Sequence, residues 1–173
     1  MLNRYCIVAL VPDPWAKDID ELRRQHDKWS KQWLPAHITV VAPFEASLSH
    51  DLVAEIEGAT VPIQVRLGGW GVFEHFRTNT VWIEGSESAT ANARRQLIQT
   101  VPRLGTIVTE PSILWDEAPS HHITVVNHVP HDALAELRQA LDPIDLEGSF
   151  TISHLTVFAW DRRLGRWLKV RPS

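Results

Sequence analysis

A five-residue string that occurs twice constrains this chain more than any other feature of its sequence. The string HITVV at residues 37–41 recurs letter for letter at residues 122–126, 85 positions later (122 − 37) in a chain of 173 residues. Its β-branched residues favour a buried strand. Side chains two apart on a strand share a face. The repeat therefore predicts two strands, one in each half, that each present one imidazole and one hydroxyl together.

The segments around the two copies follow a similar order, which indicates a duplicated unit. In each half, a helix precedes the histidine strand, and a helix and two strands follow it. Strands are expected at 5–11, 37–41, 61–67, 80–84, 122–126, 150–160 and 167–170, and helices at 17–34, 51–57, 88–101 and 132–141. The glycine-rich residues 68–73 are expected to turn or bulge, and Ser49 to cap the second helix.

Short turns and half-polar strands are typical of antiparallel sheets with helices on one face. We therefore predict an α+β fold in which residues 1–173 form a single domain of two pseudo-symmetric lobes. The antiparallel sheets would surround a central cleft, with the helices packed outside. The two histidine strands would lie side by side across that cleft.

The composition limits the classes of function. A net charge of −4, with 44% hydrophobic and 22% charged residues, is ordinary for a globular protein and argues against coating long nucleic acid. A single cysteine, Cys6, leaves no internal disulfide and no cysteine metal cluster. The first apolar run is too short for a signal peptide or a membrane span. We therefore expect a cytoplasmic protein with no membrane contact and no obligate protein partner.

Two facing histidines suit phosphodiester chemistry. Histidine has an unperturbed pKa of about 6.5, so one imidazole can take a proton from water while the other protonates a leaving oxygen. Thr39 and Thr124 would donate hydrogen bonds to the non-bridging phosphate oxygens. A lone histidine at a strand start is more often structural, but the symmetric pair His37 and His122 favours catalysis. The pattern does not assign acid or base to either one.

The segments PAHITVVAPF at 35–44 and HITV at 122–125 resemble the two motifs of the two-histidine (2H) phosphoesterase superfamily. Within it, the 2′-5′ RNA ligase and cyclic-nucleotide phosphodiesterase branch is most similar, over nearly the whole chain. The resemblance implies two lobes around a cleft, and metal-independent, cofactor-free hydrolysis of 2′,3′-cyclic phosphates or 2′-5′ bonds. Hydrolysis of the cyclic phosphate would leave a 2′-phosphate, and the resemblance also implies 2′-5′ RNA ligation as the reverse of 2′-5′ cleavage. Members often carry a basic residue near Asn127, where this chain has Asn127-His128.

Further substrate contacts are predicted more weakly, at Phe44, Trp70, Arg77, Trp115 and His154. Phe44 would wall the cleft, and Arg77 would meet a phosphate or a second nucleotide. Trp70 and Trp115 are less expected in the core than Trp82, so each is a candidate base platform, with simple packing as the alternative. His154 begins a third His-x-Thr with no counterpart in the other half. It is either a chance match or a contact at the cleft edge.

Three functions stay open on the sequence alone. The first is an enzyme acting on a small nucleotide or an RNA end, the second a noncatalytic nucleotide- or RNA-binding module, and the third a hydrolase of other phosphodiesters. Both histidines and both threonines are present, which favours the enzyme. The histidines at 121, 122, 128 and 131 match no zinc-binding spacing, so no metal site is predicted.

Overall fold

The computed structural model describes residues 3–27, 34–85, 89–108, 122–144 and 147–171. Its strands are β1 (Asn3–Leu10), β2 (His37–Ala46), β3 (Ile63–Leu67), β4 (Trp70–Glu74), β5 (Thr78–Glu84), β6 (His122–Pro130), β7 (Gly148–Ile152), β8 (Leu155–Asp161) and β9 (Arg166–Lys169). Its helices are α1 (Trp15–His26), α2 (His50–Gly58), α3 (Ala89–Thr100), α4 (Pro102–Gly105) and α5 (Leu134–Leu141), with a 3-10 turn at His131–Ala133. None of these helices is long and apolar enough to cross a membrane.

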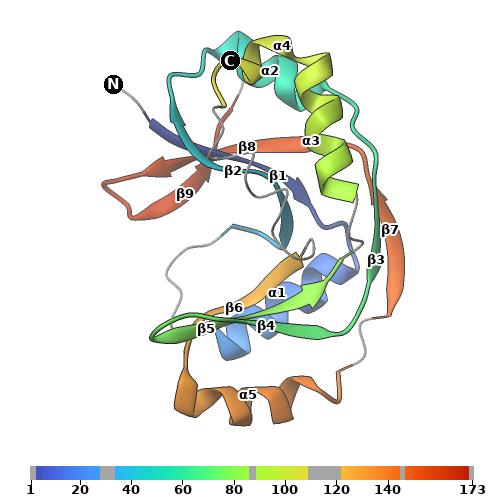
Figure 1. Ribbon diagram of the computed structural model, residues 1–173, viewed down its shortest axis with the longest axis vertical. Coiled ribbons are helices and arrows are strands. Elements are labelled where there is room, and N and C mark those ends of the chain that lie inside the picture. The colour runs from blue at the N-terminus through green and yellow to red at the C-terminus, as the bar shows by residue number, and fades with distance from the viewer. Residues whose placement is uncertain (1–2, 28–33, 86–88, 109–121, 145–146, 172–173) are drawn as a thin grey trace.

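The strands form three antiparallel sheets, with the orders β2-β1-β8-β9, β4-β5-β6 and β3-β7. Figure 1 shows the four-stranded sheet in the upper half of the view and the three-stranded sheet in the lower half, with β3 and β7 running along one side. Both histidine strands, β2 and β6, are edge strands of their sheets, and the two edges contact each other. The predicted α+β class with antiparallel sheets is confirmed.

Two strand predictions are wrong, and the helix expected over 17–34 ends at His26. Of the glycine-rich residues 68–73, residues 68 and 69 lie outside any strand, but residues 70–73 belong to strand β4, which pairs with β5. The single strand expected over 150–160 is divided into β7 and β8, which pair with β3 and β1 in different sheets. In both places long-range pairing decides the conformation, and local composition does not report it. The predicted Ser49 cap is confirmed, since the Ser49 side chain accepts the backbone N–H of Leu52 at 3.2 Å.

The strand pairing of β1 with β2 is repeated by β5 with β6. The shared pairs are His37–Leu10 with His122–Glu84, Ile38–Ala9 with Ile123–Ile83, Thr39–Val8 with Thr124–Trp82, Val41–Ile7 with Val126–Val81, Phe44–Tyr5 with Val129–Asn79, and Glu45–Arg4 with Pro130–Thr78. The offset is constant at 85 positions for the histidine strands and 74 (84 − 10) for their partners, and both register shifts recur. The duplicated unit with two lobes remains a prediction, which this repetition supports.

By this repetition the second half begins with β5, the counterpart of β1, although the sequence pattern places that strand in the first half. The two halves exchange strands, because β4 of the first half joins β5 of the second, and β8 of the second half joins β1 of the first. Helix α1 packs against β6, and α3 against β2. Strand β9 extends only the four-stranded sheet and has no counterpart beside β4. Each histidine strand is therefore supported by a helix from the other half of the chain.

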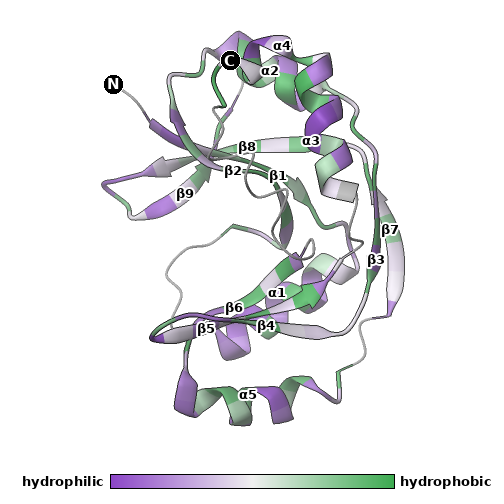
Figure 2. Cartoon of the chain, in the orientation of Figure 1, coloured by the Kyte–Doolittle hydropathy of each residue, from purple (hydrophilic) through white to green (hydrophobic). Residues whose placement is uncertain are grey.

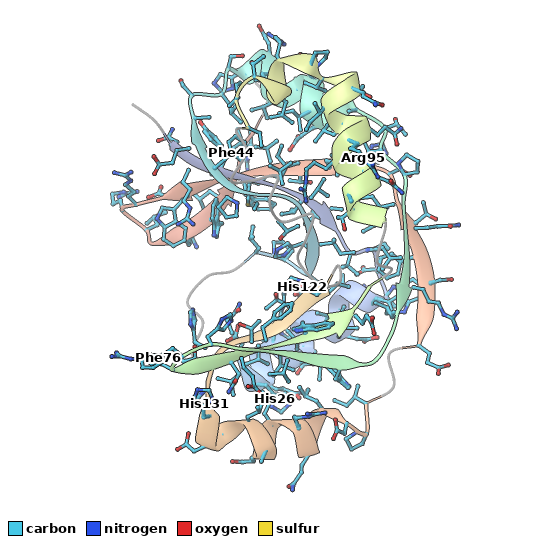
Figure 3. The ribbon with its side chains drawn as sticks, in the orientation of Figure 1. His26, Phe44, Phe76, Arg95, His122 and His131 are labelled. Carbon is cyan, nitrogen blue, oxygen red and sulfur yellow. The ribbon has the colours of Figure 1, made fainter. Side chains whose placement is uncertain are left out.

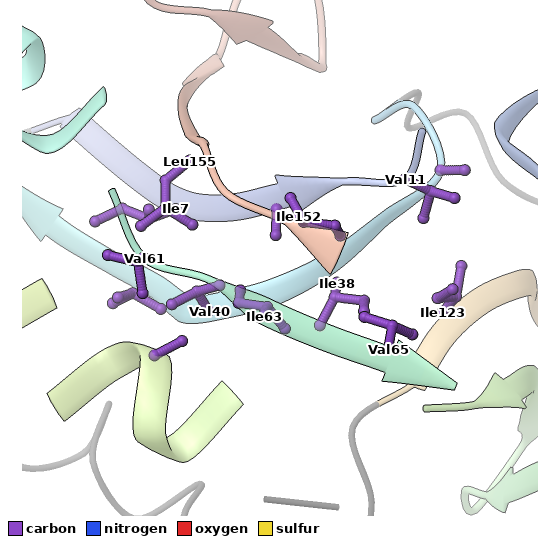
Figure 4. Packing of buried hydrophobic residues seen from close by; sticks show 14 of the residues in the cluster. Ile7, Val11, Ile38, Val40, Val61, Ile63, Val65, Ile123, Ile152 and Leu155 are labelled. Carbon is purple, nitrogen blue, oxygen red and sulfur yellow. The ribbon is translucent and has the colours of Figure 1, made fainter. Parts of the chain in front are cut away.

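One hydrophobic core is shared by both halves (Figure 4). Ile38, Val40, Ile123 and Val125 point into it and are buried, each contributing about 1.5–3 kcal/mol. Figure 2 shows hydrophobic residues (green) recurring along the strands of the larger sheets. Alternation along the strand then turns the motif histidines and threonines to the opposite face, where they are partly buried.

A smaller cluster covers that opposite face of the four-stranded sheet. It consists of Cys6, Val8, Phe158 and Trp167. Burial raises the pKa of the Cys6 thiol to about 12, so Cys6 stays a neutral thiol and packs as a small apolar side chain.

Candidate active site

The two motifs meet at one pocket of about 160 Å³. It is lined by Arg23, Asp27, Leu34, His37, Thr124, Val125, Asn127 and Trp167. A cavity needs only about 10–15 Å³ to hold a water molecule, so a phosphate group fits this space. His37 of the first motif and Thr124 of the second therefore contact the same space. Thr39 lies two residues along β2, on the face of His37.

His37 is held in one tautomer by the backbone. Its Nδ1 lies 2.7 Å from the carbonyl oxygen of Pro35, so Nδ1 carries the hydrogen and donates it. The other nitrogen, Nε2, is left with a lone pair. Burial lowers the pKa of His37 to about 4, with the nearby charges of Arg23 and His122 acting in the same direction and the Pro35 bond opposing them. His37 is therefore a neutral proton acceptor at neutral pH.

His122 stands against an aromatic wall. The Phe73 ring meets its imidazole edge-on, with centroids 4.8 Å apart, and the Trp82 ring lies at 5.9 Å. Phe73 and Trp82 stack on each other at 5.0 Å. Gly71 makes this possible, because a Cβ there would lie 2.1 Å from the Trp82 ring. Figure 3 shows His122 at the start of β6, between the two larger sheets.

Arg23 joins the site from α1. Its Nε and Nη2 donate to the carbonyl oxygen of Thr124 at 3.0 and 2.6 Å, and its Nη1 donates to the carbonyl of Leu34 at 2.8 Å and to Asp20 at 3.2 Å. The side chain is only 7% exposed. Burial lowers the pKa of Arg23, while Asp20 opposes that effect, and the guanidinium stays charged. Arg23 therefore links the backbone just before the first motif to β6, the strand that carries the second motif.

Sequence reasoning missed Arg23. One available signal was its place beside Ile19 and Leu22, the buried stripe of α1, whereas Arg24 pairs with Glu21 at the surface. A similar contact exists in the other half, where Arg94 of α3 donates from Nε to the Val40 carbonyl at 2.9 Å. Each histidine strand is thus bonded by a buried arginine from the opposite half.

Asn127 reaches the pocket because β6 is irregular. Val125 and Val126 are both buried, so the alternation shifts and Asn127 takes the face of Thr124. The Thr80 hydroxyl donates to Asn127 Oδ1 at 3.3 Å, and His75 Nε2 lies 3.3 Å from the same hydroxyl. With its oxygen engaged, Asn127 keeps two N–H donors, which have no partner among the described residues.

The weaker candidates do not line this pocket. Phe44 is buried in the core beside Tyr5, and Arg77 is exposed next to Phe76 at the tip of the β4–β5 hairpin. His154 is exposed between β7 and β8. Trp115 lies outside the described residues.

The two tryptophans of the second sheet lie opposite to expectation. Trp70 packs against the core, whereas Trp82 lies on the face of Thr124, its partner across the strands. The pairing of β4 with β5 sets the orientation of Trp70, because Trp70 pairs with the buried Ile83 and so shares its face.

Within the described part of the chain, no three His, Cys, Asp or Glu side chains gather as metal ligands would. His121, one of the four histidines considered as ligands, lies outside that part.

Several solved structures share this fold. The apo form of E. coli LigT matches with a TM-score of 0.58 and 16% identity, over 98% of this chain and 95% of that chain. The Thermus thermophilus protein TT0787 matches with 0.58 and 12%, over 97% and 95%. E. coli LigT complexed with 3′-AMP matches with 0.53 and 15%, over 98% and 95%. At these identities the likeness is one of fold.

No curated protein sequence matches the chain. A family model does, the 2′-5′ RNA ligase superfamily, over residues 11–164. That match confirms the resemblance inferred from the two motifs and supports phosphodiesterase or ligase chemistry. Because it spans most of the 173 residues, the chain belongs to the 2′-5′ RNA ligase superfamily.

Proposed function

We propose that the protein is a metal-independent phosphodiesterase that hydrolyses 2′,3′-cyclic phosphates or 2′-5′ bonds of RNA or small nucleotides. Ligation joins a 2′,3′-cyclic phosphate to a 5′-hydroxyl and is the reverse of 2′-5′ cleavage to the cyclic phosphate. The observation that carries the proposal is that His37 and Thr124, one from each motif, line one phosphate-sized pocket, with His122 close enough to affect the charge of His37. Membership of the superfamily supports the same reaction class.

In this proposal His37 is the base of hydrolysis. Water attacks the phosphorus of the cyclic phosphate, and the free Nε2 of His37 takes the water proton. The bond from phosphorus to the 3′-oxygen breaks, and His122 gives a proton to that oxygen, so the product is a 2′-phosphate. An anionic substrate favours the protonated imidazole, so it raises the proton affinity of His37 above that of the empty pocket. In ligation a 5′-hydroxyl replaces water as the nucleophile, so His37 and His122 keep these roles. They exchange in the reverse reaction, the cleavage of a 2′-5′ bond to a cyclic phosphate.

Hydrogen-bond donors would hold the charge on the phosphate. The Thr124 hydroxyl and the Asn127 amide line the pocket, and Thr39 adds a second hydroxyl. Donors placed in advance around a developing negative charge are usually the largest single contribution to such catalysis. Arg23 bonds the Thr124 backbone and so positions that hydroxyl.

The test uses the purified protein in EDTA with 2′,3′-cyclic nucleotides, and chromatography to identify the product. We expect turnover to the 2′-phosphate. His37→Ala and His122→Ala are each expected to lower kcat by about 10²–10⁴-fold, the usual contribution of a general acid or base. His50→Ala, an exposed histidine on α2, is the matched control and should keep wild-type activity.

Two results would count against the proposal. Binding of nucleotides without turnover of any cyclic phosphate or 2′-5′ dinucleotide would favour the alternative function, a noncatalytic binding module. Equal turnover of generic phosphodiesters, with no preference for nucleotides, would leave the general hydrolase.

A further inference from the structure

The β8–β9 hairpin concentrates positive charge in an acidic protein. Residues 161–171 contain five basic residues and one acidic residue, a formal charge of +4 in a chain whose total is −4. The five are exposed: Arg162, Arg163, Arg166, Lys169 and Arg171. None of them forms an ion pair with another described residue. Their charges are therefore not neutralised by ion pairs within the described chain.

Three basic residues elsewhere on the surface do form ion pairs with acids. Lys17 pairs with Asp13 at 2.9 Å, and Arg24 and Arg103 pair with glutamates. The hairpin's one acid, Asp161, is occupied otherwise, since its Oδ1 accepts the backbone N–H groups of residues 163 and 164 at 2.9 Å each. Asp161 thus shapes the turn. The hairpin therefore presents unneutralised positive charge, which attracts anions from solution.

The hairpin is connected to the pocket. Trp167 of β9 lines the pocket together with His37, and Lys169, two residues further on, shares the face of Trp167. Strand β9 is also the strand that has no counterpart in the other half. Strand β9, which makes the two large sheets unequal, therefore also belongs to the basic hairpin that extends outward from the pocket.

A second hairpin faces the same side of the molecule. Figure 1 shows the β4–β5 and β8–β9 hairpins both projecting on that side. The exposed large hydrophobic residues of the described chain lie at these two tips, Phe76 at 92% exposure and Leu164 at 44%. Arg77 stands beside Phe76, with its guanidinium carbon 5.8 Å from the ring centroid. An exposed aromatic ring next to arginine is a platform for an unpaired base.

We propose that the β8–β9 hairpin binds the phosphate backbone of a single-stranded RNA whose 3′ end occupies the pocket, with Phe76 at the opposite tip meeting an unpaired base. The preferred substrate is then the end of an RNA strand, and a free nucleotide is a poorer one. The part of this inference that places the 3′ end of the RNA in the pocket rests on the proposed function. The cations themselves recognise a chain of phosphates.

Binding is tested apart from turnover. A fluorescent single-stranded RNA of about ten nucleotides is titrated into the His122→Ala protein, which does not consume it, with anisotropy as the readout. The hairpin variant carries Arg162→Gln, Arg163→Gln and Arg166→Gln. The control carries Lys17→Gln, Arg24→Gln and Arg103→Gln, which change the net charge equally but elsewhere. Circular dichroism melting checks that both variants fold.

We expect the hairpin variant to bind at least tenfold more weakly at low salt, and the control to change by less than about twofold. The slope of log K against log salt should fall by about 2 in the hairpin variant, because single strands give about 0.7 per phosphate contact. In the protein with His122 intact, kcat/KM should fall for an RNA ending in a cyclic phosphate and stay unchanged for a cyclic mononucleotide.

Equal RNA affinity of the hairpin variant and the control overturns the inference. So does equal competition by an acidic peptide of the same charge, which would show that the hairpin reads charge without preferring RNA. RNA binding that depends on the hairpin, with no turnover of any substrate, would overturn the proposed function alone and leave the binding surface in place.

Discussion

The guanidinium of Arg23 clamps the backbone carbonyl of Thr124, with Nε at 3.0 Å and Nη2 at 2.6 Å. The two residues are 101 positions apart, and they come from opposite halves of the chain. The same guanidinium holds the Leu34 carbonyl, just before the first motif. One buried cation therefore sets the position of the second motif relative to the first, and stands near His37.

Replacing Arg23 by Met is expected to lower the free energy of unfolding by about 3 kcal/mol, since the carbonyls of Thr124 and Leu34 lose charged donors. Urea unfolding measures this. Arg23→Lys keeps the charge but loses the guanidinium's several N–H donors, so it should recover only part of the lost free energy of unfolding. Arg24→Met, on the exposed side of α1, is the control and should cost less than about 1 kcal/mol. A cost for Arg23→Met no larger than this control would contradict the clamp.

The pKa of His37 predicts a dependence of stability on pH. Its folded value, about 4, lies below the unfolded value of 6.5, so the unfolded chain binds more protons between them. This contribution to stability is present above pH 6.5 and is lost as the pH falls toward 4, by about 3 kcal/mol in all. His37→Gln should make unfolding free energies measured between pH 7 and pH 4.5 fall less steeply. An exposed control, His50→Gln, should leave the slope unchanged.

Arg23 also lowers the pKa of His37 by its charge. Arg23→Met should therefore raise that pKa, which would move the acid limb of the kcat/KM profile to higher pH. Arg23→Lys should leave the limb near its wild-type position. Identical profiles for the Met and Lys variants would show that the charge does not reach His37.

Gly71→Ala is expected to disrupt the wall behind His122. The new Cβ would lie 2.1 Å from the Trp82 ring, so Trp82 and the Phe73 ring stacked on it must move. We expect a loss of about 1–3 kcal/mol in stability and at least tenfold in kcat, because small displacements of catalytic groups are costly. Gly69→Ala is the matched control, since a Cβ there meets nothing within 4 Å. Equal kcat in both variants would argue against a role for the wall.

Asn127→Asp keeps the shape of the side chain but replaces its N–H donors by a carboxylate oxygen. Beside an anionic phosphate this adds repulsion, and KM is expected to rise at least tenfold for a cyclic nucleotide. Asn92→Asp makes the same change on the exposed surface of α3 and should leave KM within about twofold. An unchanged KM in Asn127→Asp would mean that the amide does not face the substrate.

The prediction of the four motif side chains as the centre of the site rests on local pattern alone. Alternation along a strand depends only on the backbone, so the sequence predicts that His37 and Thr39 share a face, as do His122 and Thr124. The β-branched residues between them supply the buried side, and the Ser49 cap follows from the geometry of a helix start. These features need no knowledge of distant partners.

The surroundings of the site depended on distant pairing. Register shifts in β6 turn Asn127 toward the pocket, and the ladder of β5 with β6 places Trp82 opposite Thr124. A helix from the other half delivers Arg23.

The sequence by itself therefore predicted four side chains for the site, of which His37 and Thr124 line the pocket. The tertiary structure decided which neighbours surround them, and through burial and the charge of Arg23 it decided that His37 is neutral. The physical reason is that strand alternation is a property of consecutive residues. Burial and electrostatic fields come instead from groups brought together across the whole chain.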